Sequence, residues 1–99
     1  MNRSDIIAKL KTTEADLRRF GVEHLYLFGS FARGEETMSS DVDVFVDASD
    51  QRFFELPRFM GAYETIKTAC DGREIGYATR DGLSPHIRPQ VEAEAIRIF

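Results

Sequence analysis

Two apolar runs, separated by a glycine turn and a polar loop, constrain this chain more than any other feature. Residues 22–28 end in the continuous apolar stretch Leu25–Phe28, which is typical of a strand buried on both faces. Residues 41–47 alternate and are rich in β-branched side chains, which predicts a second strand. Between the two runs, Gly29 ends the first strand, and about one helical turn follows before Gly34 breaks it. The pattern is therefore strand, tight turn, polar loop and strand.

Helical patterns lie on both sides of this unit. Residues 4–20 carry apolar side chains at helical spacing, with Ser4 as the expected N-cap and Gly21 as the stop. Residues 49–70 predict a second long helix, in which Pro57 is best tolerated in the first turn. Two further elements are expected, a short strand at residues 74–78 and a helix from about Ile87 onward.

The length and the charge limit the kind of protein. A chain of 99 residues indicates one domain, residues 1–99, too short to hold a catalytic domain and a separate acceptor domain. The net charge of -4 argues against a protein that holds duplex nucleic acid by neutralising phosphates. No apolar run approaches the roughly 20 residues that span a bilayer, and there is no apolar signal core, so we expect a cytoplasmic protein without a membrane partner. The single Cys70, on an apolar helical stripe, predicts a buried structural thiol.

The glycine turn has the composition of a phosphate-binding turn. Gly29, at the end of a buried strand, lets a phosphate approach without a Cβ in the way. A helical turn that begins at Ser30 points free N–H groups at an anion, and the Ser30 hydroxyl adds a donor. Arg33, one turn further on, can add a charge-assisted hydrogen bond to the same phosphate oxygens.

Two aspartates follow Ser30 after ten intervening residues. Asp41 and Asp43 stand at alternate strand positions, so their carboxylates project from one face and can converge on a hard cation. Magnesium suits this pair, because it binds through one or two carboxylates and substrate phosphates. Asp47 shares the face but lies about 13 Å from Asp43 along a strand, too far to join the same ion. Each feature alone is ordinary, but together they favour a nucleotide and metal site that transfers a nucleoside monophosphate.

The stretches Leu27–Gly34 and Ser40–Val46 closely resemble the signature of the DNA polymerase β nucleotidyltransferase superfamily. More narrowly, the chain is similar to the minimal nucleotidyltransferases, single domains that often act as the antitoxin of a helical toxin called HEPN. The resemblance covers nearly the whole chain, since residues 83–96 also look like the family's C-terminal stretch.

This resemblance implies a small mixed β-sheet with helices packed on one side, an α/β (α+β) fold of the polymerase β type. It implies a nucleoside triphosphate, ATP in the antitoxin branch, at the turn of Gly29, Ser30 and Arg33. It also implies Mg²⁺ with Asp41 and Asp43 as ligands, and transfer of AMP to a hydroxyl of the partner toxin.

The chain departs from the family at the third carboxylate, which the family carries on the short strand after the long helix. Gly76 stands at that position. The absence of this acid should depress nucleotide transfer more than it depresses triphosphate binding. Glu74, two residues earlier on the same strand face and with a longer side chain, is the candidate substitute.

Three interpretations stay open. The first is an enzyme that transfers AMP to a partner protein, and the second is a catalytically impaired module of the same fold that acts by binding a helical partner. The third is a transferase half of the aminoglycoside type that needs a substrate-binding subunit. All three predict a partner, because so short a chain has little room for an acceptor pocket. His24 and His86 are expected to be surface or cap residues rather than bases.

Overall fold

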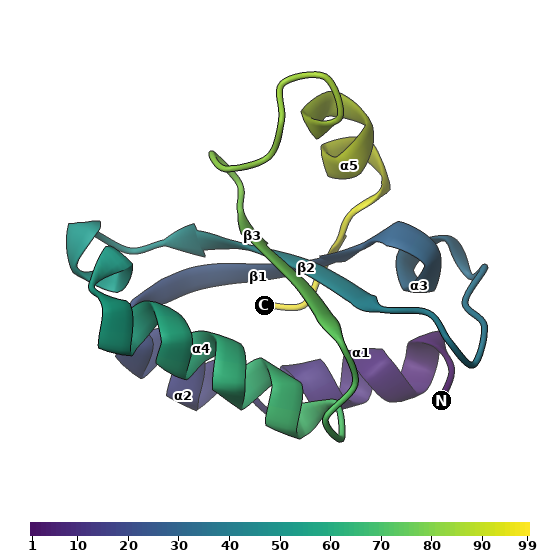
Figure 1. Ribbon diagram of the computed structural model, residues 1–99, viewed down its shortest axis with the longest axis horizontal. Coiled ribbons are helices and arrows are strands. Elements are labelled where there is room, and N and C mark those ends of the chain that lie inside the picture. Colours follow the sequence, from purple (N-terminus) through teal and green to yellow (C-terminus); the bar gives the residue numbers. More distant parts are fainter.

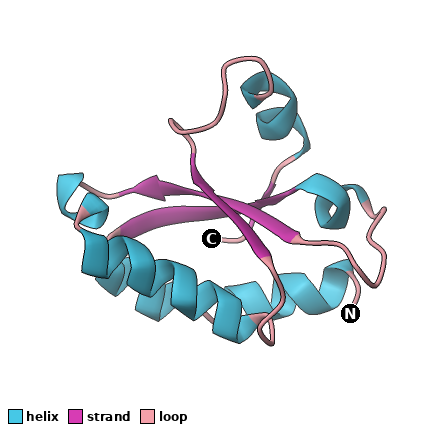
Figure 2. Cartoon of the chain, viewed as in Figure 1, coloured by secondary structure: helices cyan, strands magenta, loops and turns pink.

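A four-stranded mixed sheet organises the computed structural model, which describes residues 1–99. The order across the sheet is β3-β2-β1-β4. Figure 2 shows the strands in magenta, with cyan helices on both sides of the sheet. The strands are β1 (Val22–Phe28), β2 (Val42–Ala48), β3 (Ile75–Thr79) and β4 (Ile96–Arg97). β1 pairs antiparallel with β2 and with β4, whereas β2 and β3 run parallel. The three longer strands and the mixed sheet confirm the sequence-based expectation, and β4 is an addition to it.

The strand register brings distant residues to the same place. Asp43, near the start of β2, stands opposite Phe28 at the end of β1 and opposite Gly76 on β3. Three features therefore meet at one edge of the sheet: the end of the first apolar run, the beginning of the second, and the position of the missing acid.

Three helices cover one face of the sheet: α1 (Arg3–Lys11), α2 (Glu14–Phe20) and α4 (Leu56–Ala69) (Figure 1). The predicted single helix over residues 4–20 is therefore wrong, because it divides at Thr12 and Thr13. The hydroxyls of these threonines donate to the carbonyls of Lys9 and Leu10, and they compete with continuation of the helix.

The ends of these helices follow capping chemistry. The N-cap of α1 is Asn2 and not Ser4, because Asn2 and Asp5 form a reciprocal capping box. Gly21 ends α2 in the left-handed conformation, as expected.

The predicted helix over residues 49–70 is also divided. Asp50 caps a short 3₁₀ helix, η1 (Gln51–Phe54), and α4 then begins with Pro57 in its first turn. A proline lacks an N–H and disfavours helical backbone in the residue before it, so an α-helix starts there more easily than it passes through. No helix of the protein has the length and apolar character that crossing a membrane requires.

The larger core lies between the sheet and α1, α2 and α4, and includes Leu27, Val44, Phe53 and Ile66. A smaller cluster of Phe45, Leu83 and Val91 lies on the opposite face, where the short α5 (Arg88–Glu94) packs. Figure 1 shows α5 across the sheet from α1, α2 and α4. Hydrogen bonds of Glu94 connect α5 to α3 (Gly29–Arg33). α5 therefore brings the C-terminal part of the chain to the glycine turn.

Candidate active site

The glycine turn forms where β1 passes directly into α3. Gly29 has a φ of 75°, in the left-handed region, and Gly34 ends α3 with a φ of 72°. A Cβ on Gly29 would also overlap the Asp43 carboxylate. Glycine at position 29 is thus required both by the backbone conformation and by the neighbouring aspartate.

The turn holds an anion that belongs to the protein itself. The Gly29 N–H donates to Glu94 Oε1 at 3.3 Å, and Arg33 Nη1 donates to Glu94 Oε1 and Oε2 at 3.3 and 3.1 Å. Glu94 is the last residue of α5, and its side chain is only 18% exposed. The hydrogen bond and the charge of Glu94 raise the pKa of Arg33. The N–H and guanidinium expected to face phosphate therefore converge on a carboxylate.

Sequence reasoning missed Glu94. The chain separates it from Gly29 by 65 residues, and no local motif marks it. The only signal was its place near the end of the segment that resembles the family's C-terminal stretch.

A shallow pocket of about 350 Å³ opens at this turn. Gly29, Ser30, Arg33, Asp43 and Glu94 all line it. The structure therefore brings the three expected nucleotide-binding residues together with one of the two expected metal ligands.

Asp43 is half-buried between two glycines. Its carboxylate occupies the space that a Cβ on Gly29 or on Gly76 would take. Burial raises the pKa of Asp43, the charges of Asp41 and Glu94 raise it further, and Arg33 opposes them. A half-buried carboxylate repelled by two others is a place where a cation would be favourable.

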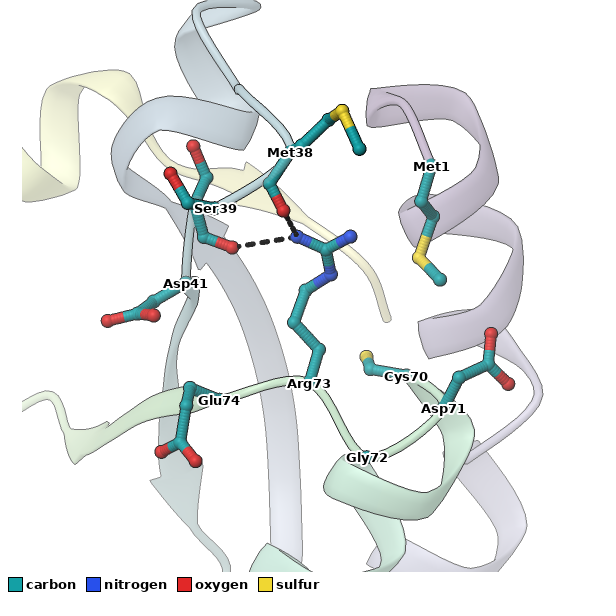
Figure 3. A pocket seen from close by; sticks show the side chains of 10 residues that line it. Met1, Met38, Ser39, Asp41, Cys70, Asp71, Gly72, Arg73 and Glu74 are labelled. Carbon is teal, nitrogen blue, oxygen red and sulfur yellow. Dashed lines mark hydrogen bonds between the residues drawn. The ribbon is translucent and has the colours of Figure 1, made fainter.

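Asp41 lies just before β2, is exposed, and lines a neighbouring pocket of about 360 Å³ (Figure 3). Arg73 donates from Nη1 to the carbonyls of Met38 and Ser40, at 3.2 and 3.0 Å, and so fixes the loop that leads to Asp41. The two aspartates thus border adjacent pockets.

Glu74 pairs with a lysine and does not point toward Asp41. It lines the pocket beside Asp41, but Figure 3 shows the two side chains pointing in different directions. The Glu74 carboxylate pairs with Lys67 Nζ at 3.7 Å and its side chain is 75% exposed. Glu94, and not Glu74, lines the same pocket as Asp43, and its charge raises the pKa of Asp43.

The carboxylates fit a magnesium ion that arrives with phosphate. No three His, Cys, Asp or Glu side chains are grouped so that they could hold a metal by themselves. Asp41 and Asp43 nevertheless interact electrostatically, and one or two carboxylates together with substrate phosphates are the usual magnesium site. Asp41 and Asp43 would hold such an ion, which would neutralise phosphate charge and make an attacking hydroxyl more acidic.

The remaining candidates are structural. Asp47 accepts two hydrogen bonds from Arg80, at 2.7 and 3.0 Å, and takes no part in the site, as expected. Cys70 is fully buried, which confirms the predicted buried thiol, and burial raises its pKa to about 11. His86 is exposed, and His24 is partly buried at the start of β1.

The mixed sheet, the glycine turn and the aspartate that opens the adjacent strand are the arrangement of a nucleotidyltransferase. Residues 10–98 match the model of the family described as nucleotidyltransferase domain. The chain belongs to this family, and it is a minimal nucleotidyltransferase of the DNA polymerase β superfamily, which confirms the resemblance seen in the sequence.

Its relatives in sequence are named as protein adenylyltransferases. One from Methanocaldococcus jannaschii, provisionally so named, is 25% identical over 95 residues, or 95% of this chain and 92% of the relative. The protein adenylyltransferase MntA of Thermococcus cleftensis is 38% identical over 63 residues, or 59% of this chain and 64% of that protein.

Solved structures share the fold. A structure provisionally described as a minimal nucleotidyltransferase has a TM-score of 0.80 and 28% identity, covering 97% of this chain and 95% of the other. A toxin–antitoxin structure solved with AMP-PNP has a TM-score of 0.67 at 23% identity, covering 90% and 72% of the two chains. The second match supports the fold alone.

Proposed function

We propose that this chain binds ATP with Mg²⁺ and transfers AMP to a hydroxyl of a partner protein, as the antitoxin of a toxin–antitoxin pair. The observation that carries the proposal is the anion held at the glycine turn. The Gly29 N–H and the Arg33 guanidinium already bind a carboxylate, at the side of the Asp43 carboxylate. A triphosphate offers the same charge and more oxygens to these donors.

Each site residue has a separate role in the proposal. Gly29, Ser30 and Arg33 hold phosphate oxygens, and Asp41 and Asp43 hold the magnesium ion. The acceptor hydroxyl attacks the α-phosphorus of ATP, the bond to the β-phosphate oxygen breaks, and pyrophosphate leaves while the hydroxyl proton passes to a base or to water. The protein contributes chiefly by positioning and by placing positive charge near the phosphates.

The pockets and the relatives both support a protein partner that supplies the acceptor. Both pockets bordering the aspartates are open to solvent, which leaves room for an acceptor side chain from another protein. Relatives named as protein adenylyltransferases and a neighbour solved as a toxin–antitoxin complex support a toxin as the partner. The resemblance seen in the sequence suggests a small helical toxin of the HEPN type. A substrate-binding subunit is the alternative partner.

Gly76 favours a second function. A module that binds its partner without transferring a nucleotide needs the fold and no third acid, and Gly76 leaves that position without a side chain. In this case, the partner is neutralised by contact alone.

Incubation with ATP labelled at the α-phosphate, Mg²⁺ and the small protein encoded by the neighbouring reading frame separates the two functions. Label on the partner, lost in Asp43→Asn, supports transfer. Binding of the partner by both the wild type and Asp43→Asn, without label, supports the module and would rule out transfer.

A further inference from the structure

Glu94 connects the short helix α5 to the glycine turn through every hydrogen bond that its carboxylate makes. All three go to the Gly29 N–H and to Arg33 Nη1. Glu94 is more buried than Arg33, with side chains 18% and 41% exposed. The carboxylate therefore sits inside the pocket, with the guanidinium closer to solvent.

We infer that Glu94 is an internal competitor for the phosphate position, and that a triphosphate enters only when this carboxylate leaves Gly29 and Arg33. The inference rests on the proposed function, because it assigns the same two donors to ATP. The Gly29 N–H has one hydrogen, and a carboxylate and a phosphate cannot both occupy its direction.

Electrostatic repulsion also opposes simultaneous occupancy of the turn by the Glu94 carboxylate and a triphosphate. A triphosphate seated beside an ionised Glu94 and an ionised Asp43 would place like charges together at carboxylates that are themselves partly buried, so that water screens their repulsion less than it would at an exposed surface. Releasing Glu94 into water removes one of these charges and frees the two donors.

The release requires no movement of the helix. Val91 anchors α5 in the small apolar cluster, and Arg80 binds Glu92 on the same helix. Glu94 lies at the end of α5, and a change of side-chain rotamer is enough to withdraw its carboxylate. A partner that contacts the exposed surface of α5 could shift this equilibrium, and the glycine turn would then respond to partner binding.

The test measures binding of inorganic tripolyphosphate, and of a non-hydrolysable ATP analogue, by calorimetry with Mg²⁺. Glu94→Gln keeps the size and removes the charge, and we expect about tenfold tighter binding of both probes. Glu94→Asp keeps the charge but shortens its reach, so an intermediate gain is expected. Glu35→Gln is the matched control, because Glu35 also pairs with Arg33, at 3.4 Å, but does not contact Gly29. It should change affinity much less.

The outcomes separate this inference from the proposed function. Equal or weaker binding by folded Glu94→Gln and Glu94→Asp, with a wild type that binds, overturns the competition and leaves nucleotide binding intact. Tighter binding by Glu94→Gln without label transfer supports the competition and removes the catalytic function. If the wild type and both variants bind neither probe, both proposals fail.

Discussion

Asp43 and Gly76 are register partners in the parallel pair β2 and β3, and the Asp43 carboxylate fills the space that a side chain on Gly76 would take. The Asp43 carboxylate therefore fills the position to which the sequence resemblance assigns the family's third acid. A carboxylate introduced at position 76 should therefore displace the Asp43 side chain instead of acting as a third acid beside it.

Gly76→Asp tests this relationship. The new Cβ would overlap Asp43 Oδ1, and the new charge would face an ionised Asp43. We expect the free energy of unfolding at neutral pH to fall by about 1–3 kcal/mol. Urea denaturation with and without Mg²⁺ and the ATP analogue measures the loss, and the ligand should reduce it.

Gly76→Ala is the matched control for the steric part. The φ of Gly76 is not in the left-handed region, so alanine in an open strand would raise stability by about 0.5–1 kcal/mol. Crowding against Asp43 predicts a loss instead. A stabilised Gly76→Ala protein would show that the Asp43 carboxylate does not fill this space.

Asp43→Asn should stabilise the isolated protein while it removes magnesium-dependent nucleotide binding. Burial, with Asp41 and Glu94, raises the pKa of Asp43 in the folded state above its ordinary value of 3.8. The ionised carboxylate therefore costs stability above the folded pKa. The cost shrinks as pH falls and vanishes once both states are protonated below about 3.8.

Urea denaturation as a function of pH measures this effect. We expect a gain of up to about 1 kcal/mol for Asp43→Asn at pH 7 and no gain in acid. Asp41→Asn is the control, because Asp41 is exposed and its substitution should change stability by less than about 0.5 kcal/mol. A pH-independent gain for Asp43→Asn would contradict the electrostatic explanation.

Gly29→Ala and Gly34→Ala form a matched pair at the two ends of α3. Their φ angles are 75° and 72°, so both alanines carry a similar backbone cost of about 1–2 kcal/mol. Nothing lies within 4 Å of a Cβ on Gly34, whereas a Cβ on Gly29 would overlap the Asp43 carboxylate. Gly29→Ala should therefore cost at least about 1 kcal/mol more and should abolish binding of tripolyphosphate. Equal losses in urea denaturation would mean that Asp43 lies elsewhere.

The sequence predicted the parts of the site that are close in the chain. Gly29, Ser30 and Arg33 form one turn, and Asp43 opens the neighbouring strand, so local patterns and one antiparallel pairing were enough. Glu94 could not be predicted, because its contact depends on how α5 crosses the sheet. β4 was missed for a related reason: Ile96–Arg97 is too short to show a strand period and is defined by pairing with β1.

The predicted helix boundaries were wrong where side chains compete with backbone N–H groups for hydrogen bonds. The apolar spacing over residues 4–20 continues through Thr12 and Thr13, so the pattern gave no sign of a break. The break comes from two hydroxyls bonded to the carbonyls of the preceding turn. The apolar pattern reports which face is buried, and it does not report these local hydrogen bonds.

Arg80 should be the most costly surface arginine to remove. Its guanidinium binds Asp47 on β2 and Glu92 on α5, and it lies 4.8 and 5.0 Å from the ring centres of Tyr26 and Phe45. Arg80→Ala would leave the partly buried Asp47 carboxylate unpaired and would leave Glu92 only its ion pair with Arg88, and we expect it to lower the free energy of unfolding by about 2–3 kcal/mol. Arg80→Lys loses the paired hydrogen bonds to Asp47 and should cost about 1 kcal/mol.

Arg52 provides the comparison, since it also pairs with an aspartate, Asp50 at 3.0 Å, but is 72% exposed. Arg52→Ala should cost less than about 0.5 kcal/mol. Arg80 also ties α5 to the sheet, so its loss should loosen the Glu94 contact at the glycine turn. Hydrogen exchange of the Gly29 amide measures this loosening. Faster exchange in Arg80→Ala and unchanged exchange in Arg52→Ala are expected, whereas equal exchange in the two variants would show that α5 is held at the turn without Arg80.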